Sequence, residues 1–173
     1  MSAISATPNN TAAVRRPGMV TAAISIVVVT ALAAIANGVI IITGGKELFK
    51  QLLENAGLNG LTDADLDVAS RFLGYDSFDG LISAFTTRGY LVAGAGVVLL
   101  LFGLGALKAA TWARVMVTIS AVAVMIFSVV VIADETNGAM AGLSLLAILG
   151  GILSIIFVWL PANGRYKKAL GNA

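Results

Sequence analysis

Two charge-free runs that follow each other along the chain restrict its fold more than any other feature. Residues 89–107 and 115–133 each form a run of 19 residues without Asp, Glu, Lys, Arg or His. At about 1.5 Å of rise per residue, a helix of this length approaches the roughly 30 Å of a bilayer's hydrocarbon core. The pattern predicts a membrane hairpin. The turn between the runs carries Lys108 and Arg114 and no acid, which places it on the cytoplasmic side by the positive-inside rule.

The composition of the whole chain agrees with a membrane protein. Hydrophobic residues make up 58% of its 173 residues and charged residues only 12%, and the mean hydropathy is +0.95, values outside the range of a soluble domain. The sequence contains neither Cys nor His, so it lacks the usual ligands of haem, iron–sulfur clusters and zinc. No nucleophile motif is present either. We therefore expect no cofactor, no metal site, no catalytic residue and no enzymatic activity.

The charges divide completely between the two predicted sides of the membrane. The bases expected in the cytoplasm, with no acid among them, are Arg15, Arg16, Lys108, Arg114, Arg165, Lys167 and Lys168. The opposite side holds the other four bases and all nine acids. This separation predicts four spans with both termini in the cytoplasm. The bases form no patch interleaved with aromatic residues, so the expected partners include membrane lipids and no nucleic acid.

The amino-terminal part predicts a tail and a first span. Residues 1–16 are polar and predict a disordered cytoplasmic tail, whereas residues 17–45 are free of charge and end in two glycines. A cleavable signal peptide is the alternative, because residues 34–36 form a small-x-small cleavage pattern. The apolar run continues beyond that pattern, which favours an uncleaved span.

The whole chain is expected to form an all-α integral membrane protein, a four-helix bundle with an extracytoplasmic helical insert between the first two spans. After the insert, the predicted segments are a second span (89–107), a cytoplasmic turn (108–114), a third span (115–133), an outer turn (134–137), a fourth span (138–161) and a basic cytoplasmic tail (162–173). The short outer turn makes the third and fourth spans antiparallel neighbours.

Residues 46–88, which we call the cap, are the only sizeable part outside the predicted spans. Their pattern predicts three short amphipathic helices. The first ends near Gly57, the second is capped by the Thr62 hydroxyl, and the third starts near Asp76 or Ser77 and continues into the second span.

The apolar faces of these helices exceed what a segment of this size can bury alone. The residues expected to contact the bundle, the lipid interface or another protein are Leu48, Phe49, Leu52, Leu53, Phe72, Leu73, Phe78, Leu81, Ile82 and Phe85. The second helix is expected to align Leu66, Ala69, Phe72 and Leu73 on one side. We therefore expect the cap to be the functional part of the chain.

Three pairs of small residues four positions apart predict close helix packing. The pairs are Ala34 with Gly38, Gly138 with Gly142, and Ala147 with Gly151. Such spacing lets helix backbones approach each other in lipid. Packing within the bundle is favoured over a dimer or partner face, because these pairs are frequent in membrane helices.

Polar residues near or within the spans give few functional signals. Asn37 is the single strongly polar side chain deep in a predicted span, and an interhelical hydrogen bond is favoured over a transport site. The spans contain no ionisable residue, whereas proton-coupled transporters and voltage sensors generally place one at depth. In the cap, Asp63, Asp65 and Asp67 alternate as in a calcium loop, but the later positions of that loop do not match. Acids at a helix N-terminus are the favoured interpretation.

Three segments together resemble the small four-span membrane proteins of actinobacteria. They are residues 15–23 at the entry to the first span, the Thr-Asp-Ala-Asp segment at 62–65, and residues 159–166 at the exit of the last span. The resemblance implies a bacterial plasma membrane and supplies no catalytic residue. By analogy with accessory membrane subunits of actinobacterial respiratory supercomplexes, a similar role is conceivable.

Two hypotheses of function follow. The leading one is a non-catalytic accessory or scaffold protein that binds a larger membrane complex through its helix faces and the cap. The alternative is a homo-oligomeric channel or a carrier of lipid or a small hydrophobic molecule, with a polar path lined by Asn37, Thr118, Ser120 or Ser128.

Overall fold

The computed structural model describes residues 18–106, 111–133 and 137–160, and within these ranges its regular secondary structure is helical. Its helices are α1 (Gly18–Asn55), α2 (Asp63–Phe72), α3 (Phe78–Gly105), α4 (Thr111–Ala133) and α5 (Gly138–Val158). Four of them, α1, α3, α4 and α5, are long and apolar enough to cross a membrane. The prediction of an all-α membrane protein with four apolar helices is confirmed. The predicted tails and residues 108–110 and 134–136 of the two short turns lie outside the described residues, and residues 111–114 belong to α4.

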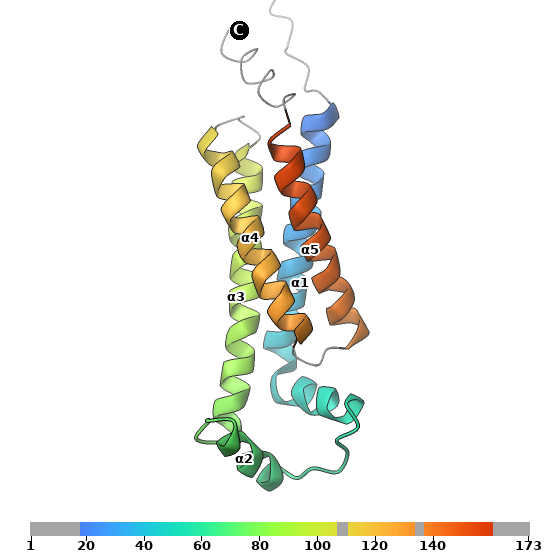
Figure 1. Cartoon of the computed structure of the whole chain (residues 1–173), viewed down its shortest axis with the longest axis vertical. Helices are drawn as coiled ribbons and strands as arrows, with labels where there is room; N and C mark the ends of the chain where they lie inside the picture. The colour runs from blue at the N-terminus through green and yellow to red at the C-terminus, as the bar shows by residue number, and fades with distance from the viewer. Residues whose placement is uncertain (1–17, 107–110, 134–136, 161–173) are drawn as a thin grey trace, which may run out of the picture.

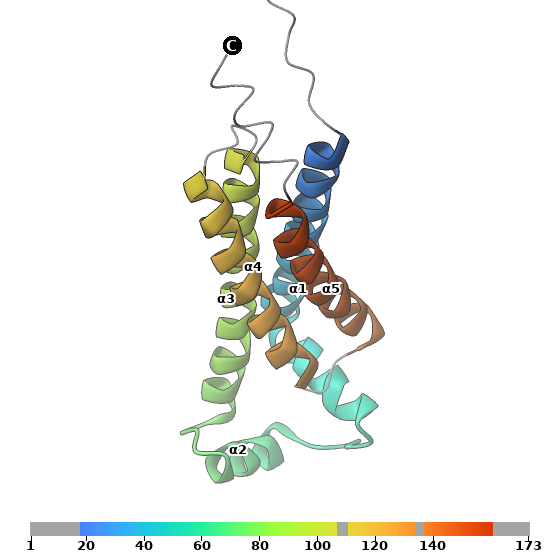
Figure 2. The ribbon, with the colours of Figure 1, turned by 45° about the horizontal axis from the view of Figure 1, so that its top comes forward.

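The four long helices lie side by side, and α2 lies beyond one end of them (Figure 1). Helix α1 contacts α3 and α5, and α4 contacts the same two helices, so the four form a closed ring of neighbours. Successive long helices run in opposite directions (Figures 1 and 2). The start of α1 and the end of α5 therefore lie at the end of the molecule opposite α2.

The buried residues of the long helices repeat every seven positions. In α1 they include Val20, Val27, Ala34, Ile41 and Leu48, in α3 they include Phe78, Phe85, Val92 and Leu99, and in α5 they are Met140, Ser144, Ala147, Gly151, Ser154 and Val158. A seven-residue repeat keeps one stripe of a helix against its neighbours in left-handed packing with small crossing angles. Its members are often small, which lets the helices pack closely without ionisable groups between them.

Glycines bring α1 and α3 into close contact. Gly38 of α1 faces Gly89 and Ala93 of α3: a Cβ atom at Gly38 would lie 2.6 Å from both the Gly89 carbonyl oxygen and the Ala93 backbone nitrogen. Gly96, seven residues after Gly89, also faces α1, where an added Cβ atom would lie 3.0 Å from the Ala31 carbonyl oxygen. No larger residue fits at these positions without separating the two helices.

A bend at Gly45 turns the last part of α1 away from the axis of the bundle (Figure 1). Gly45 has φ 45° and ψ −126°, a conformation that a residue with a side chain rarely adopts. The expected end of the first span coincides with this bend, but the helix resumes and continues to Asn55. Leu48 and Leu52 lie beyond the bend and pack with Phe85 of α3 in the core. The bend therefore joins the cap to the bundle.

The predicted starts of the next two helices are confirmed. Thr62 is the N-cap of α2, and Ser77 is the N-cap of α3, whose hydroxyl accepts a hydrogen bond from the Gly80 backbone N–H at 3.2 Å. Helix α3 then runs without interruption from the cap into the second apolar stretch. The cap and the bundle thus share two continuous helices.

Candidate functional site

Aromatic side chains pack the bent end of α1 against the start of α3. The ring of Phe49 lies 5.9 Å from that of Phe78 and 5.5 Å from that of Phe85, centroid to centroid, in tilted and edge-on arrangements. The Lys46 ammonium lies 5.0 Å from the centroid of the Phe78 ring. Edge-on aromatic pairs and a cation over a ring are favourable geometries. This cluster gives the cap a packed base.

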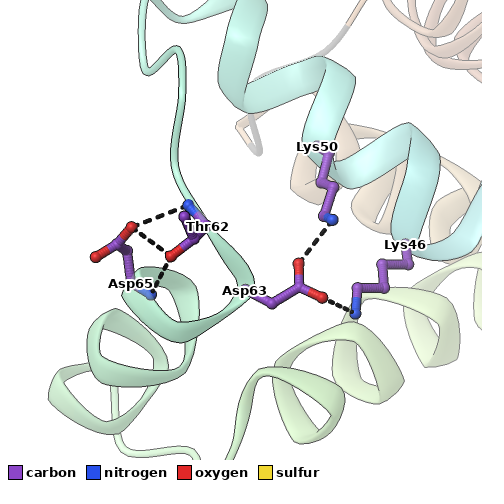
Figure 3. Close-up of polar contacts among 5 residues, drawn as sticks. All are labelled: Lys46, Lys50, Thr62, Asp63 and Asp65. Carbon is purple, nitrogen blue, oxygen red and sulfur yellow. Dashed lines mark hydrogen bonds and ion pairs between the residues drawn. The ribbon is translucent and has the colours of Figure 1, made fainter.

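Ion pairs attach α2 to the bent end of α1. One oxygen of the Asp63 carboxylate lies 2.9 Å from the Lys46 ammonium, and the other lies 2.7 Å from the Lys50 ammonium (Figure 3). Hydrogen bonds from Lys50 and Lys46 lower the pKa of Asp63 to about 2. Because Asp63 is the first residue of α2, these two lysines hold the start of that helix against the bent end of α1.

Two further acids order the rest of α2. Asp65 and Thr62 form a capping box: the Thr62 hydroxyl accepts from the Asp65 backbone N–H at 3.3 Å, and the Asp65 carboxylate accepts from the Thr62 backbone N–H at 2.9 Å (Figure 3). The Asp65 carboxylate also accepts from the Thr62 hydroxyl at 2.6 Å. Both bonds to this carboxylate lower the pKa of Asp65. Asp67 accepts from the Arg71 guanidinium and from the Phe78 backbone N–H, each at 3.0 Å, which ties α2 to the first residue of α3.

The three alternating acids therefore contact three separate sets of partners. Asp63 binds lysines, Asp65 binds its own helix cap, and Asp67 binds Arg71 and the start of α3. In a calcium loop the corresponding oxygens converge on one ion. Within the described ranges, no group of three or more His, Cys, Asp or Glu residues is arranged to hold a metal ion.

The apolar cap residues singled out by the sequence differ widely in exposure. Leu48, Leu52, Phe78 and Phe85 are buried, Phe49, Leu53, Leu81 and Ile82 are half-buried, and Phe72 and Leu73 are exposed. The buried set joins α1 to α3. The exposed set is the most accessible to a partner protein.

The predicted apolar face of α2 is buried only in part. Leu66 and, one turn later, Ser70 are the buried residues of α2, whereas Ala69, Phe72 and Leu73 are exposed. In this orientation Asp63 pairs with two lysines of α1, and Asp67 accepts a hydrogen bond from the first residue of α3. Ser70 tolerates burial because its hydroxyl donates to the Asp67 carbonyl oxygen at 2.8 Å.

The outward side of α2 carries an apolar patch. We call Val68, Ala69 and Phe72 the α2 patch; Val68 is 57% exposed and Phe72 is 88% exposed. Aromatic residues are common anchors in protein interfaces. A single exposed Leu on a surface is ordinary, whereas an almost fully exposed Phe beside another exposed apolar residue indicates a binding surface. The sequence did not single out Val68, although its spacing of four from Phe72 places both on one helical face.

The three pairs of small residues differ in burial and in their contacts with other helices. Ala34 and Gly38 are buried, with Gly38 against α3. Ala147 and Gly151 are also buried, and a Cβ atom at Gly151 would lie 2.7 Å from Cγ of Met125 in α4. The third pair, Gly138 and Gly142, is exposed, and no described atom lies within 4 Å of a Cβ built at either residue. That pair does not pack within the described bundle.

Three of the four candidate residues of a polar path are buried inside a single copy of the chain, and Thr118 is half-buried. The Asn37 side-chain amide donates to the Ser144 hydroxyl of α5 at 2.7 Å, which is the interhelical bond that the sequence favoured. Ser120 and Ser128 of α4 are buried. The Thr118 hydroxyl donates to the Arg114 carbonyl oxygen and accepts from the Trp159 indole N–H at 3.0 Å.

Sequence reasoning missed some residues that these contacts depend on. Ser144 was not identified as the partner of Asn37, and Lys46 and Lys50 were not identified as anchors for α2. The four-residue spacing of the two lysines and the repeat that contains Ser144 were the signals present.

Comparison of the chain with protein-family models, curated proteins and solved structures finds no match.

Proposed function

We propose that this chain is a non-catalytic accessory subunit of a larger membrane complex, in which four membrane helices anchor a cap whose α2 patch binds another protein. The exposure of Phe72 carries the proposal: 88% of this side chain is accessible on a helix held in place by charged and capping contacts. An aromatic residue presented in this way is suited to be the centre of an interface.

The rigidity of the support favours binding. Lys46 and Lys50 of α1 hold α2 at Asp63, and the start of α3 holds it at Asp67. A surface that is ordered before it binds loses less conformational entropy on binding than a flexible one does. The patch therefore meets its partner with little rearrangement.

The composition of the long helices supports an anchoring role over a transport role. Residues 18–44, 89–105, 115–133 and 138–158 contain no Asp, Glu, Lys, Arg or His. Ion-coupled transport generally uses such a group at depth. The alternative of a path between copies has less support, because Asn37 and Ser128 are each buried within one copy.

The distribution of charge supports an orientation for the proposal. The cap lies on the outer side and the two termini lie in the cytoplasm, since the predicted cytoplasmic segments contain bases and no acid. The membrane is the plasma membrane of a bacterium, and a respiratory supercomplex is a suitable partner by analogy with the accessory subunits of actinobacteria.

Affinity isolation from native membranes in mild detergent tests the proposal. We expect a membrane protein to copurify with the parent chain, and the Val68→Ser/Phe72→Ser variant to recover at least about tenfold less of it, since two interface residues are lost. Leu58→Ser is the matched control, because Leu58 is an exposed cap residue (51%) outside α2. Equal recovery by all three chains, or purification of the parent as a lone monomer, would refute the proposal.

A further inference from the structure

A second feature of the cap is an apolar hollow on the side of α3 that faces the bent end of α1. Its volume is about 390 Å³. The residues that line it, which define the cap hollow, are Phe49, Leu52, Leu53, Leu73, Tyr75, Leu81, Ala84, Phe85 and Arg88. Helix α1, helix α3 and the segment that joins α2 to α3 each contribute to the lining. None of the α2 patch residues does.

The polar groups of the cap hollow are few and lie among aliphatic and aromatic side chains. Tyr75 supplies a phenol and Arg88 a guanidinium, and the other lining side chains are Ala, Leu and Phe. Small-molecule sites typically combine a mostly apolar wall with a few polar groups that fix the orientation of the ligand. The cap hollow has this character.

The position of the cap hollow connects it with the membrane. Arg88 is the residue immediately before the charge-free stretch 89–107, so it marks the level at which α3 leaves the hydrocarbon. The wall of the cap hollow that α1 contributes begins shortly after the bend at Gly45, where α1 leaves the first apolar stretch. A molecule dissolved in the outer leaflet can therefore reach the cap hollow without crossing bulk water.

We propose that the cap hollow binds the alkyl chain of a single-chain anionic amphiphile from the membrane, a long-chain fatty acid, with its carboxylate at Arg88. The volume lies near the lower end of the range of small-molecule pockets, about 300–1,000 Å³, which suits one chain better than the two chains of a diacyl lipid. The guanidinium pairs well with a carboxylate because its N–H groups match the two oxygens. This binding is independent of the partner at the α2 patch.

Photolabelling of the purified full chain tests this inference. The chain is reconstituted in phosphatidylcholine vesicles with palmitate that carries a diazirine near its methyl end, and the labelled peptides are identified. We expect label within residues 49–88, and at least about tenfold less of it in Ala84→Phe, which fills the cap hollow. Ala36→Phe is the matched control, because Ala36 is exposed on α1 outside the cap, and it should label as the parent does.

The charge is tested with a neutral probe of equal length. Arg88→Gln should weaken labelling by diazirine palmitate about tenfold, because hydrogen bonds to a charged group are lost, and should leave labelling by the corresponding diazirine alcohol unchanged. Retained alcohol labelling also shows that the cap hollow persists in this variant. Equal palmitate labelling of the parent and Ala84→Phe, label confined to the spans, or equal loss of both probes in Arg88→Gln would overturn the proposal. Stronger labelling by a diacyl phosphatidylglycerol probe would also overturn it.

Discussion

At the scale of single residues, the amide of Asn37 shows what sequence can and cannot predict in a membrane bundle. A lone polar side chain in a long apolar stretch must find a hydrogen-bond partner on another helix, so the kind of contact was predictable. Its partner, Ser144, lies 107 positions away. Nothing local specifies that pairing, which depends on how α1 and α5 are aligned.

Replacing Asn37 should destabilise the bundle through that pairing. Asn37→Leu removes the hydrogen bond to Ser144, and we expect a coupling energy of about 0.5–1.7 kcal/mol between the two positions, as for other hydrogen bonds between membrane helices. A double-mutant cycle with Ser144→Ala, followed by unfolding in mixed micelles, measures it. Thr43→Val is the control, because the exposed Thr43 hydroxyl bonds only within its own helix. A coupling near zero would contradict the expected role of Asn37.

Glycines that face α3 and glycines that face outward should respond differently to the same change. Gly38→Ala places a methyl group 2.6 Å from backbone atoms of α3, and we expect a loss of about 1–3 kcal/mol in the free energy of unfolding. Gly94→Ala, with no atom within 4 Å, should be neutral or stabilising by up to about 1 kcal/mol, because Ala has the higher helix propensity. Unfolding of both variants in mixed micelles measures the difference. Similar losses would mean that α1 and α3 are not in close contact.

At the scale of the elements, the cap shows where local signals succeed and where they fail. Thr62 and Ser77 were predictable as helix starts, because a cap depends on residues a few positions apart. The exposure of Phe72 was not, because it depends on Asp63 binding lysines 13 and 17 residues earlier. The apolar pattern of α2 alone allows more than one side to face inward.

The ion pairs at Asp63 give the attachment of α2 a definite pH dependence. The pKa of Asp63 falls from 3.8 to about 2 on folding, so its ionised form stabilises the cap fully above about pH 4. That stabilisation is lost as the pH falls from about 3.8 to about 2. Carbon-13 NMR titration of the carboxyl in micelles should give a midpoint near 2, and Lys46→Met/Lys50→Met should raise it toward 3.8. A midpoint near 3.8 in the parent chain would show that α2 is not held by these lysines.

At the scale of the whole molecule, the number of long helices and their apolar character followed directly from the charge-free runs. The bilayer sets a minimum length for a span, and this leaves little freedom in the count. The order in which the four helices neighbour one another was harder to predict from the sequence. That order depends on a seven-residue repeat of small and medium side chains. In a chain that is apolar almost throughout, this repeat is a weaker signal than the overall hydropathy.

The proposed orientation can be tested with single cysteines, because the sequence contains none. We expect Glu54→Cys, in the cap, to react with a membrane-impermeant maleimide on intact cells, since the cap is proposed to lie outside. Ala109→Cys, in the basic turn 108–114, should react only after the cells are permeabilised. The reverse pattern would place the cap in the cytoplasm and exclude an extracytoplasmic partner.

Photo-crosslinking from position 72 in native membranes tests directly whether the α2 patch binds another membrane protein. With a photoreactive amino acid in place of Phe72, the account predicts one discrete adduct with another membrane protein, because this side chain is 88% exposed on an ordered helix. The same group in place of Leu58 should give little or none of that adduct. No adduct at position 72, equal adducts at both positions, or an adduct made only of two copies of this chain would contradict the account.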